Sequence, residues 1–108
     1  MKLKLKKPIV FFDLETTGVK IATDRIVEIS LLKILPNGNK ESKTWLVNPT
    51  IDIPYETTLI HGITNEKVEN EPTFKDLAKE IFEFIHNCDL AGYNSNKFDI
   101  PLLAEEFL

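Results

Sequence analysis

The sequence predicts an α/β fold in which helices flank a mixed β-sheet. Three observations lead to this prediction. Residues 8–12 form an apolar run rich in β-branched and aromatic side chains, which is typical of a central strand covered on both faces. Two strand-like runs joined by an Asn-Gly turn follow, and a helical pattern then precedes a fourth, short strand. Because a helical crossover returns the chain parallel, we expect an antiparallel three-strand meander with one parallel strand beside it.

The composition fits one small domain. The chain has 108 residues, 43% of them hydrophobic, which is enough for a single modest core. It contains neither an apolar run of membrane-spanning length nor the pattern of a signal peptide. The single cysteine, Cys88, excludes an internal disulfide and fits a reducing cytoplasm. We therefore expect a cytoplasmic protein without a membrane partner.

The net charge of −4 bears on the kind of partner. It argues against a protein that binds along an extended nucleic acid through contacts with many phosphates. It does not exclude an enzyme that takes only the end of a strand, because metal ions can supply the local positive charge there. The charge alone therefore does not decide between these classes.

The N-terminal half is expected to supply three strands. A basic arm at residues 1–8 precedes the first strand, which begins at Ile9. Alternating and then continuously apolar residues predict a long second strand at residues 25–35. The turn at residues 36–39 contains Asn-Gly, the strongest short hairpin signal, and the return strand covers residues 40–47.

The segment after the hairpin begins with a long connection, residues 50–71, which we expect to be irregular and functional rather than idle. Thr73 and Asp76 have the spacing of a capping box and predict a helix that runs to about His86. A short strand follows at residues 89–93. The expected apolar face of the helix consists of Phe74, Leu77, Ala78, Ile81, Phe82 and Ile85.

A polar turn at residues 94–99 leads into a second helix, for which Pro101 suits the first turn. No Gly, Asn or Pro ends this helix, and its last residues, Phe107 and Leu108, are apolar. The pattern predicts that the sequence is the front part of a longer domain.

Two carboxylates stand at the end of the first strand. Asp13 and Glu15 point to the same side of the strand, whereas Leu14 points to the other. Adjacent acids repel each other, and a divalent cation between them relieves this repulsion; hard oxygen ligands suit Mg²⁺ or Mn²⁺. The alternative is a strand end at which both carboxylates face water.

A third acid, Asp99, comes just beyond the strand that should lie next to the first one. Since side chains at the carboxyl ends of parallel strands gather at one edge of the sheet, Asp13, Glu15 and Asp99 are expected to meet there. Three such carboxylates favour two metal ions about 3.5–4 Å apart, an arrangement used in phosphodiester cleavage. The alternative for Asp99 is an acid stabilised by a helix N-terminus.

Several motifs occur in the order seen in one known family. They are residues Phe12–Gly18, Arg25–Ile29, Ile60–Thr64, Pro72–Phe74 and Asn94–Asp99. From Ile9 onward the chain resembles the DnaQ-like branch of the DEDD 3′–5′ exonucleases, the family of the proofreading subunit of bacterial replicative polymerase and of ribonuclease T.

This resemblance implies a ribonuclease H-like fold, C-terminally incomplete, and metal-dependent removal of nucleotides from a 3′ end. The implied partners are a single-stranded 3′ end of DNA or RNA and a polymerase or another replication or repair protein. The implied metal ligands and catalytic residues are Asp13, Glu15 and Asp99, with Mg²⁺ or Mn²⁺ as cofactor. The implied substrate-binding residues are Leu14, Thr16, Thr17, His61, Asn94 and Phe98.

Some of these residues have a purely structural role as the alternative. His61 can equally be a loop histidine that bonds to backbone. Phe98 can be a core aromatic residue, and Asn94 can satisfy the backbone of a turn. Glu28, in the middle of the second strand, faces either the acids or solvent.

The sequence departs from the family at one point. The third motif of the histidine-containing subclass supplies a general base and a fourth aspartate, and both would follow Leu108. His61 and His86 precede the second motif, so neither has the context to replace that base. We therefore expect residues 9–108 to be part of an exonuclease domain, with a partial metal site and little activity in this chain alone.

Two other functions remain open. A haloacid-dehalogenase-like phosphatase also carries an Asp-x-acid-Thr motif after its first strand, but the hairpin after Arg25 and the motif at residues 94–99 argue against it. A degenerate nuclease fold that binds metal or a nucleic-acid end without cutting is the non-enzymatic alternative. The choice between DNA and RNA depends on contacts to the 2′-hydroxyl that the sequence does not display.

Overall fold

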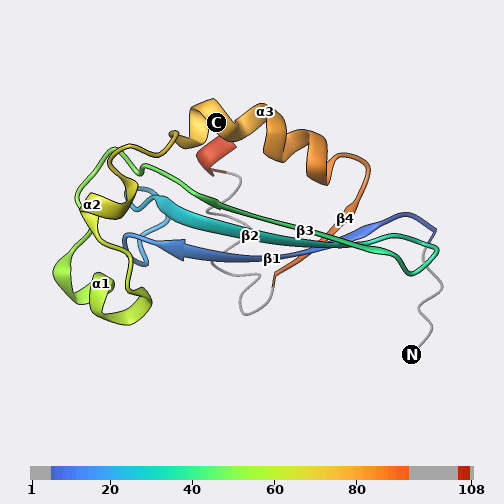
Figure 1. Ribbon diagram of the computed structural model, residues 1–108, viewed down its shortest axis with the longest axis horizontal. Coiled ribbons are helices and arrows are strands. Elements are labelled where there is room, and N and C mark those ends of the chain that lie inside the picture. The colour runs from blue at the N-terminus through green and yellow to red at the C-terminus, as the bar shows by residue number, and fades with distance from the viewer. Residues whose placement is uncertain (1–5, 93–104, 108) are drawn as a thin grey trace.

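A four-stranded mixed sheet forms the centre of the described structure, a computed structural model that covers residues 6–92 and 105–107 (Figure 1). The strand order is β3-β2-β1-β4. β1 pairs antiparallel with β2 and parallel with β4, and β2 pairs antiparallel with β3. The strands are β1 (Ile9–Thr16), β2 (Ile26–Ile34), β3 (Lys40–Leu46) and β4 (Asp89–Gly92). The predicted meander, the parallel strand and the central position of the first strand are confirmed.

The hairpin between β2 and β3 forms where the Asn-Gly signal predicts it. Gly38 has a φ of 88°, a left-handed conformation that glycine adopts without steric cost. Its N–H donates to the carbonyl of Leu35 at 2.8 Å, and the side chain of Asn37 accepts from the N–H of Asn39 at 2.9 Å. The turn therefore fixes the register of the meander locally.

The helix α3 (Phe74–Ile85) covers one face of the sheet (Figure 1). Thr73 and Asp76 form the predicted capping box, in which each side chain accepts from the backbone N–H of the other residue. The core between helix and sheet contains Val10, Phe12, Leu14, Ile29, Leu31, Phe74, Leu77, Ile81 and Phe84.

The expected apolar face of α3 is wrong at one position. Phe82 is 51% exposed and stacks against His86, with ring centroids 5.1 Å apart. Phe84 is instead buried at 8% exposure and meets the ring of Trp45 edge to face at 6.3 Å. The packing partner on β3 decides which phenylalanine faces the core. Cys88 packs half-buried against the same core.

The connection at residues 50–71 is not irregular throughout, contrary to the prediction. It contains the helices α1 (Tyr55–His61) and α2 (Asn65–Val68). α1 has no buried residue and therefore shows no apolar period in the sequence. α2 has only four residues, and Thr64 caps its N-terminus with a side chain that accepts from the N–H of Lys67. A second, smaller core of Val27, Ile53, Ile63 and Val68 lies under this segment.

The helices are placed differently relative to the sheet. α1 and α2 lie beyond the end of the sheet where β1 finishes and β2 begins (Figure 1). The helical residues 105–107 lie on the same side of the sheet as α3, where Phe107 meets Phe74 edge to face at 5.0 Å. The predicted second helix is described only at these residues. None of the described helices has the length and apolar character needed to cross a membrane.

Candidate active site

Asp13 and Glu15 lie on the same face of β1, near its carboxyl end. Asp13 is exposed and Glu15 is partly buried. In the antiparallel pair of β1 and β2, Asp13 lies opposite Ser30 and Glu15 lies opposite Glu28. Residues directly opposite each other in an antiparallel pair share a face, so Glu28 faces the acids rather than the core. Three carboxylates on two neighbouring strands give this face a local negative charge and oxygen ligands of the kind that Mg²⁺ and Mn²⁺ prefer.

β4 brings the next part of the chain to the same edge. Phe12 is paired with Gly92, so β4 ends beside the acid-bearing end of β1. The motif residues Asn94, Phe98 and Asp99 follow immediately but lie outside the described residues, so their approach to Asp13 stays a prediction. Within the described ranges, no group of three or more His, Cys, Asp or Glu residues could hold a metal ion, so Asp13, Glu15 and Glu28 do not form a complete metal site by themselves.

Thr17 is enclosed rather than presented at the surface. Its side chain is 1% exposed. Its hydroxyl donates to Oδ1 of Asp24 at 2.8 Å and accepts from the N–H of Arg25 at 3.0 Å. Its own N–H donates to the carbonyl of Arg25 at 2.9 Å. Thr16 is also buried, and its hydroxyl donates to the carbonyl of Gly18 at 2.6 Å. Both threonines thus hold the turn after β1.

His61 fastens α1 to the end of β1. Its Nδ1 accepts from the N–H of Ile63 at 3.1 Å, so the ring proton lies on Nε2. Nε2 then donates to the carbonyl of Thr16 at 3.0 Å. Thr57 makes a parallel contact, with its hydroxyl donating to the carbonyl of Thr17 at 3.0 Å. Of the two roles open to His61 in the sequence, bonding to backbone is the one that the structure displays.

Leu14 points away from the acids. It is buried in the core between the sheet and α3, as the alternation along the strand predicts. Its side chain therefore supports the strand from behind, and only its backbone lies near the acid-bearing edge.

Two exposed apolar residues near this edge were missed by sequence reasoning. Val19 is 83% exposed in the turn that follows Gly18, and Ile60 is 84% exposed on α1, next to His61. α1 turns its polar residues Thr57 and His61 toward the end of β1 and leaves Ile60 outside. No periodic pattern could have revealed this, because the helix is inverted relative to an ordinary amphipathic helix.

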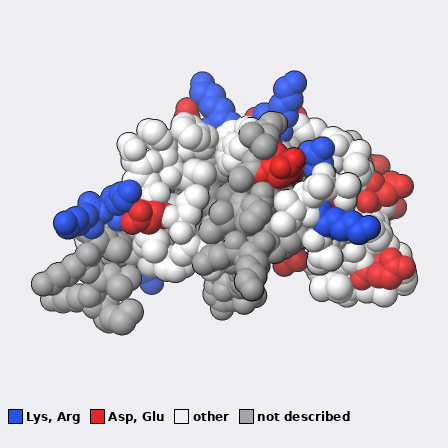
Figure 2. Space-filling view, turned by 180° about the vertical axis from the view of Figure 1, so that it is seen from behind, with Lys and Arg blue, Asp and Glu red and all other residues white. Residues whose placement is uncertain are grey.

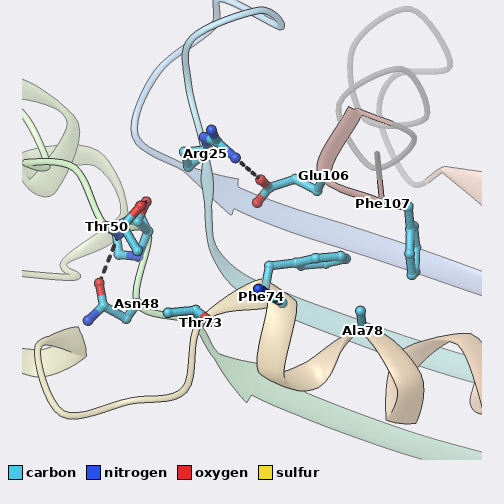
Figure 3. A pocket seen from close by; sticks show the side chains of 10 residues that line it. Arg25, Asn48, Thr50, Thr73, Phe74, Ala78, Glu106 and Phe107 are labelled. Atoms are coloured by element: carbon cyan, nitrogen blue, oxygen red, sulfur yellow. Dashed lines mark hydrogen bonds and ion pairs between the residues drawn. The ribbon is translucent and has the colours of Figure 1, made fainter.

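Two hollows help to locate the site. One of about 320 Å³ lies beside Asp13 and is lined by Phe11, Leu32 and Thr44 among others. A larger one of about 590 Å³ lies between α3, residues 48–50 and residues 105–107, and it contains none of the predicted site residues (Figure 3).

Several polar side chains of this larger hollow are engaged with one another or with backbone. Glu106 binds Arg25 at 3.0 Å and also accepts from the N–H of Ile26 at 3.2 Å, and Asn48 accepts from the N–H of Thr50 at 2.8 Å. We therefore place the candidate site at the acid-bearing edge of the sheet and not in the larger hollow.

The charge on one face of the molecule is mixed in sign. Figure 2 shows basic and acidic side chains interspersed on one face, without a continuous basic stripe among the described residues. A protein that tracks a nucleic-acid backbone would gather Lys and Arg along its path.

Comparison with known proteins places this geometry in context. The model of an exonuclease family, RNase_T, matches residues 10–108. Among curated proteins, the epsilon subunits of DNA polymerase III of Buchnera aphidicola and Rickettsia conorii are 33% and 35% identical over 106 and 102 residues. These alignments cover 92% and 90% of this chain, and 45% and 43% of the relatives. The PolC-type DNA polymerase III of Clostridium perfringens is 31% identical over 99 residues, covering 92% of this chain and 7% of that protein. The chain thus spans less than half the length of these relatives.

Solved structures of exonuclease I share the fold. An ExoI/SSB-Ct complex superimposes with a TM-score of 0.83 at 22% identity, covering 95% of this chain and 24% of that chain. Exonuclease I from Methylocaldum szegediense gives a TM-score of 0.78 at 23% identity, covering 89% of this chain and 22% of that chain. The expected ribonuclease H-like arrangement of the sheet is confirmed by this likeness.

Proposed function

This chain belongs to the exonuclease family, and on that premise we propose that it removes nucleotides from the 3′ end of DNA or RNA with the help of Mg²⁺ or Mn²⁺. The epsilon relatives are named as subunits of a DNA polymerase, and a replicative polymerase is the partner that we propose here as well. Because the chain spans only part of those relatives, the proposal concerns the complete domain to which residues 9–108 would contribute.

One observation carries the proposal. Asp13 and Glu15 share a face at the end of a central strand, and the parallel strand β4 ends beside them and leads directly to Asn94 and Asp99. Side chains that follow parallel strands at the same edge of a sheet are suited to act together. A set of carboxylates without sulfur or imidazole ligands fits Mg²⁺ or Mn²⁺ rather than zinc.

The residues have separate tasks in this proposal. Asp13, Glu15 and Asp99 hold the ions. When bound, two ions supply an activated water and stabilise negative charge on the leaving oxygen. Asn94 and Phe98 contact the substrate, as the family resemblance implies.

The terminal base has its own contact surface. Val19 and Ile60 are almost fully exposed apolar side chains that belong to the turn after β1 and to the helix fastened onto it. Every base has a planar face, so burying these aliphatic side chains against it would not depend on the base sequence. Thr16 and His61 shape this surface by donating to backbone carbonyls, and Thr17 shapes it by donating to the carboxylate of Asp24.

A cleavage assay tests the proposal. A 5′-labelled single-stranded DNA and its RNA counterpart would be incubated with Mn²⁺ and three proteins: the 108-residue chain, the same chain extended to the length of its epsilon relatives, and the extended chain with Asp13→Asn. Asp89→Asn in the extended chain is the matched control, because Asp89 lies opposite Ile9 at the other end of β1.

Stepwise shortening from the 3′ end that Asp13→Asn abolishes and Asp89→Asn leaves intact is the expected result. Comparison of the rates at which the DNA and the RNA oligonucleotides are shortened shows whether the site prefers deoxyribose or ribose. Binding of both oligonucleotides by the extended chain without any cleavage would contradict the proposal and favour a non-catalytic module on the same fold.

A further inference from the structure

The carboxylate of Asp24 lies against the turn that follows the acid-bearing strand. Its Oδ1 accepts from the hydroxyl of Thr17 at 2.8 Å, and its Oδ2 accepts from the N–H of Lys20 at 2.7 Å. The N–H of Asp24 in turn donates to the carbonyl of Lys20 at 2.7 Å. One side chain therefore connects the end of β1 with the far side of the turn.

Gly18 is required by this arrangement for space and not for backbone conformation. A β-carbon at Gly18 would lie 2.5 Å from Oδ2 and 2.9 Å from Cγ of Asp24. The φ of Gly18 is not positive, so its backbone alone would accept another residue. The three atoms nearest to such a β-carbon all belong to Asp24. The two residues thus depend on each other: the carboxylate can approach only because residue 18 has no side chain.

The same stretch of backbone is also held by α1. The carbonyls of Thr16 and Thr17 accept from His61 and Thr57. Asp24 therefore completes a clamp on residues 16–18, and Val19, which is 83% exposed, projects from the end of the clamped segment.

We propose that Asp24 is a positioning residue of the exonuclease site: its carboxylate, seated against Gly18, fixes the turn so that Val19 is presented to the terminal nucleotide. This inference rests on the proposed function. It assigns a role in substrate affinity to a residue whose carboxylate contacts Thr17 and Lys20 of the turn.

A set of variants in the complete domain tests the inference. For the Asp24→Ala variant we expect KM for the single-stranded oligonucleotide to rise about tenfold, with kcat within about threefold, because a loosened turn weakens binding more than chemistry. For Asp24→Asn we expect a smaller rise in KM, because the amide oxygen can still accept from Thr17 while its NH₂ group cannot accept from Lys20.

The double variant carries the sharpest prediction. Gly18→Ala alone forces the carboxylate away and should raise KM at least as much as Asp24→Ala does. In the Asp24→Ala background the obstructing atoms are gone, so adding Gly18→Ala should raise KM by less than about twofold. Such non-additivity is expected only of residues in direct contact.

The outcomes separate the inference from the function on which it rests. If the unsubstituted protein cleaves nothing, the proposed function fails and the role of Asp24 fails with it. If it cleaves and Asp24→Ala leaves KM unchanged, only the role of Asp24 is overturned. The same holds if the increase in KM of the double variant equals the product of the increases caused by the two single substitutions. Loss of kcat with unchanged KM would also overturn it. Should Asp24→Ala fail to fold, the KM and kcat of Asp24→Asn and Gly18→Ala test the inference instead: a raised KM with little change in kcat supports it, and an unchanged KM overturns it.

Discussion

The Nε2 nitrogen of His61 lies 3.0 Å from the carbonyl oxygen of Thr16. This contact joins the last turn of α1 to the strand that carries Asp13 and Glu15. Since α1 buries none of its residues, its position depends on such polar contacts and not on an apolar face. The helix is therefore attached to the candidate site by a small number of hydrogen bonds.

His61→Ala should detach α1 from β1. The substitution removes the contacts to Thr16 and Ile63, each worth about 0.5–1.5 kcal/mol, so the free energy of unfolding should fall by about 1–3 kcal/mol. Amide hydrogen exchange in residues 55–61 should accelerate more than exchange in α3. Gln at position 61 can still donate to Thr16 and should keep part of the protection. Unchanged exchange in α1 after His61→Ala would show that other contacts hold the helix.

Phe84→Ala and Phe82→Ala form a matched pair on one helix. Phe84 is 8% exposed and lies against Trp45 and the ammonium group of Lys33, which sits 4.3 Å from its ring centroid. Its removal should cost about 3–5 kcal/mol of stability in chemical denaturation. Phe82 is 51% exposed, and its removal should cost less than about 1 kcal/mol. Equal losses for the two variants would contradict the observed orientation of α3.

This pair also shows where sequence reasoning reaches its limit. The capping box set the start of α3, because the signal lies within four consecutive residues. The face of the helix could not be fixed in the same way, because apolar residues occupy positions 81, 82, 84 and 85. Both phenylalanines fit a helical period, and only the partner on β3 distinguishes them.

In the candidate site, too, the features set by local sequence were predicted and those set by contacts between distant residues were not. Alternation along one strand correctly placed Asp13 and Glu15 on one face and Leu14 on the other. The facing position of Glu28 follows from pairing between strands, which local sequence does not specify. Asp24 was not identified at all, since its role arises from a contact with Gly18 across a turn that has no recognisable sequence pattern.

Divalent cations should stabilise the folded protein through the acid-bearing face. Ligands that bind only the native state raise the free energy of unfolding, by about 2.7 kcal/mol at a concentration one hundred times Kd. Thermal unfolding should therefore shift upward when Mn²⁺ is added. Asp13→Asn should abolish this shift, and without metal it should not lower the melting temperature, since it removes negative charge from a face that also carries Glu15 and Glu28.

Asp89→Asn serves as the control for the metal titration. Asp89 is an exposed acid paired with Lys7 at the opposite end of β1, so its loss removes the same formal charge far from the candidate site. If both variants lost the Mn²⁺-induced rise in melting temperature equally, the rise would depend on the net charge of the protein and not on binding of the ion by Asp13.

The exposed apolar residues at the site should affect binding without affecting stability. Val19→Ala and Ile60→Ala remove side chains that are 83% and 84% exposed, so neither should change the free energy of unfolding by more than about 0.5 kcal/mol. If each contacts the terminal base, each should weaken binding of a short single-stranded oligonucleotide, measured by fluorescence anisotropy, by about 1–2 kcal/mol, because each substitution removes two or three buried aliphatic carbons at about 0.8 kcal/mol apiece. Phe82→Ala is the control, because Phe82 is likewise exposed but lies on α3. Equal affinity in the unsubstituted protein and in both alanine variants would remove Val19 and Ile60 from the substrate surface, and the role proposed for Asp24 would then lose the contact that it is meant to position.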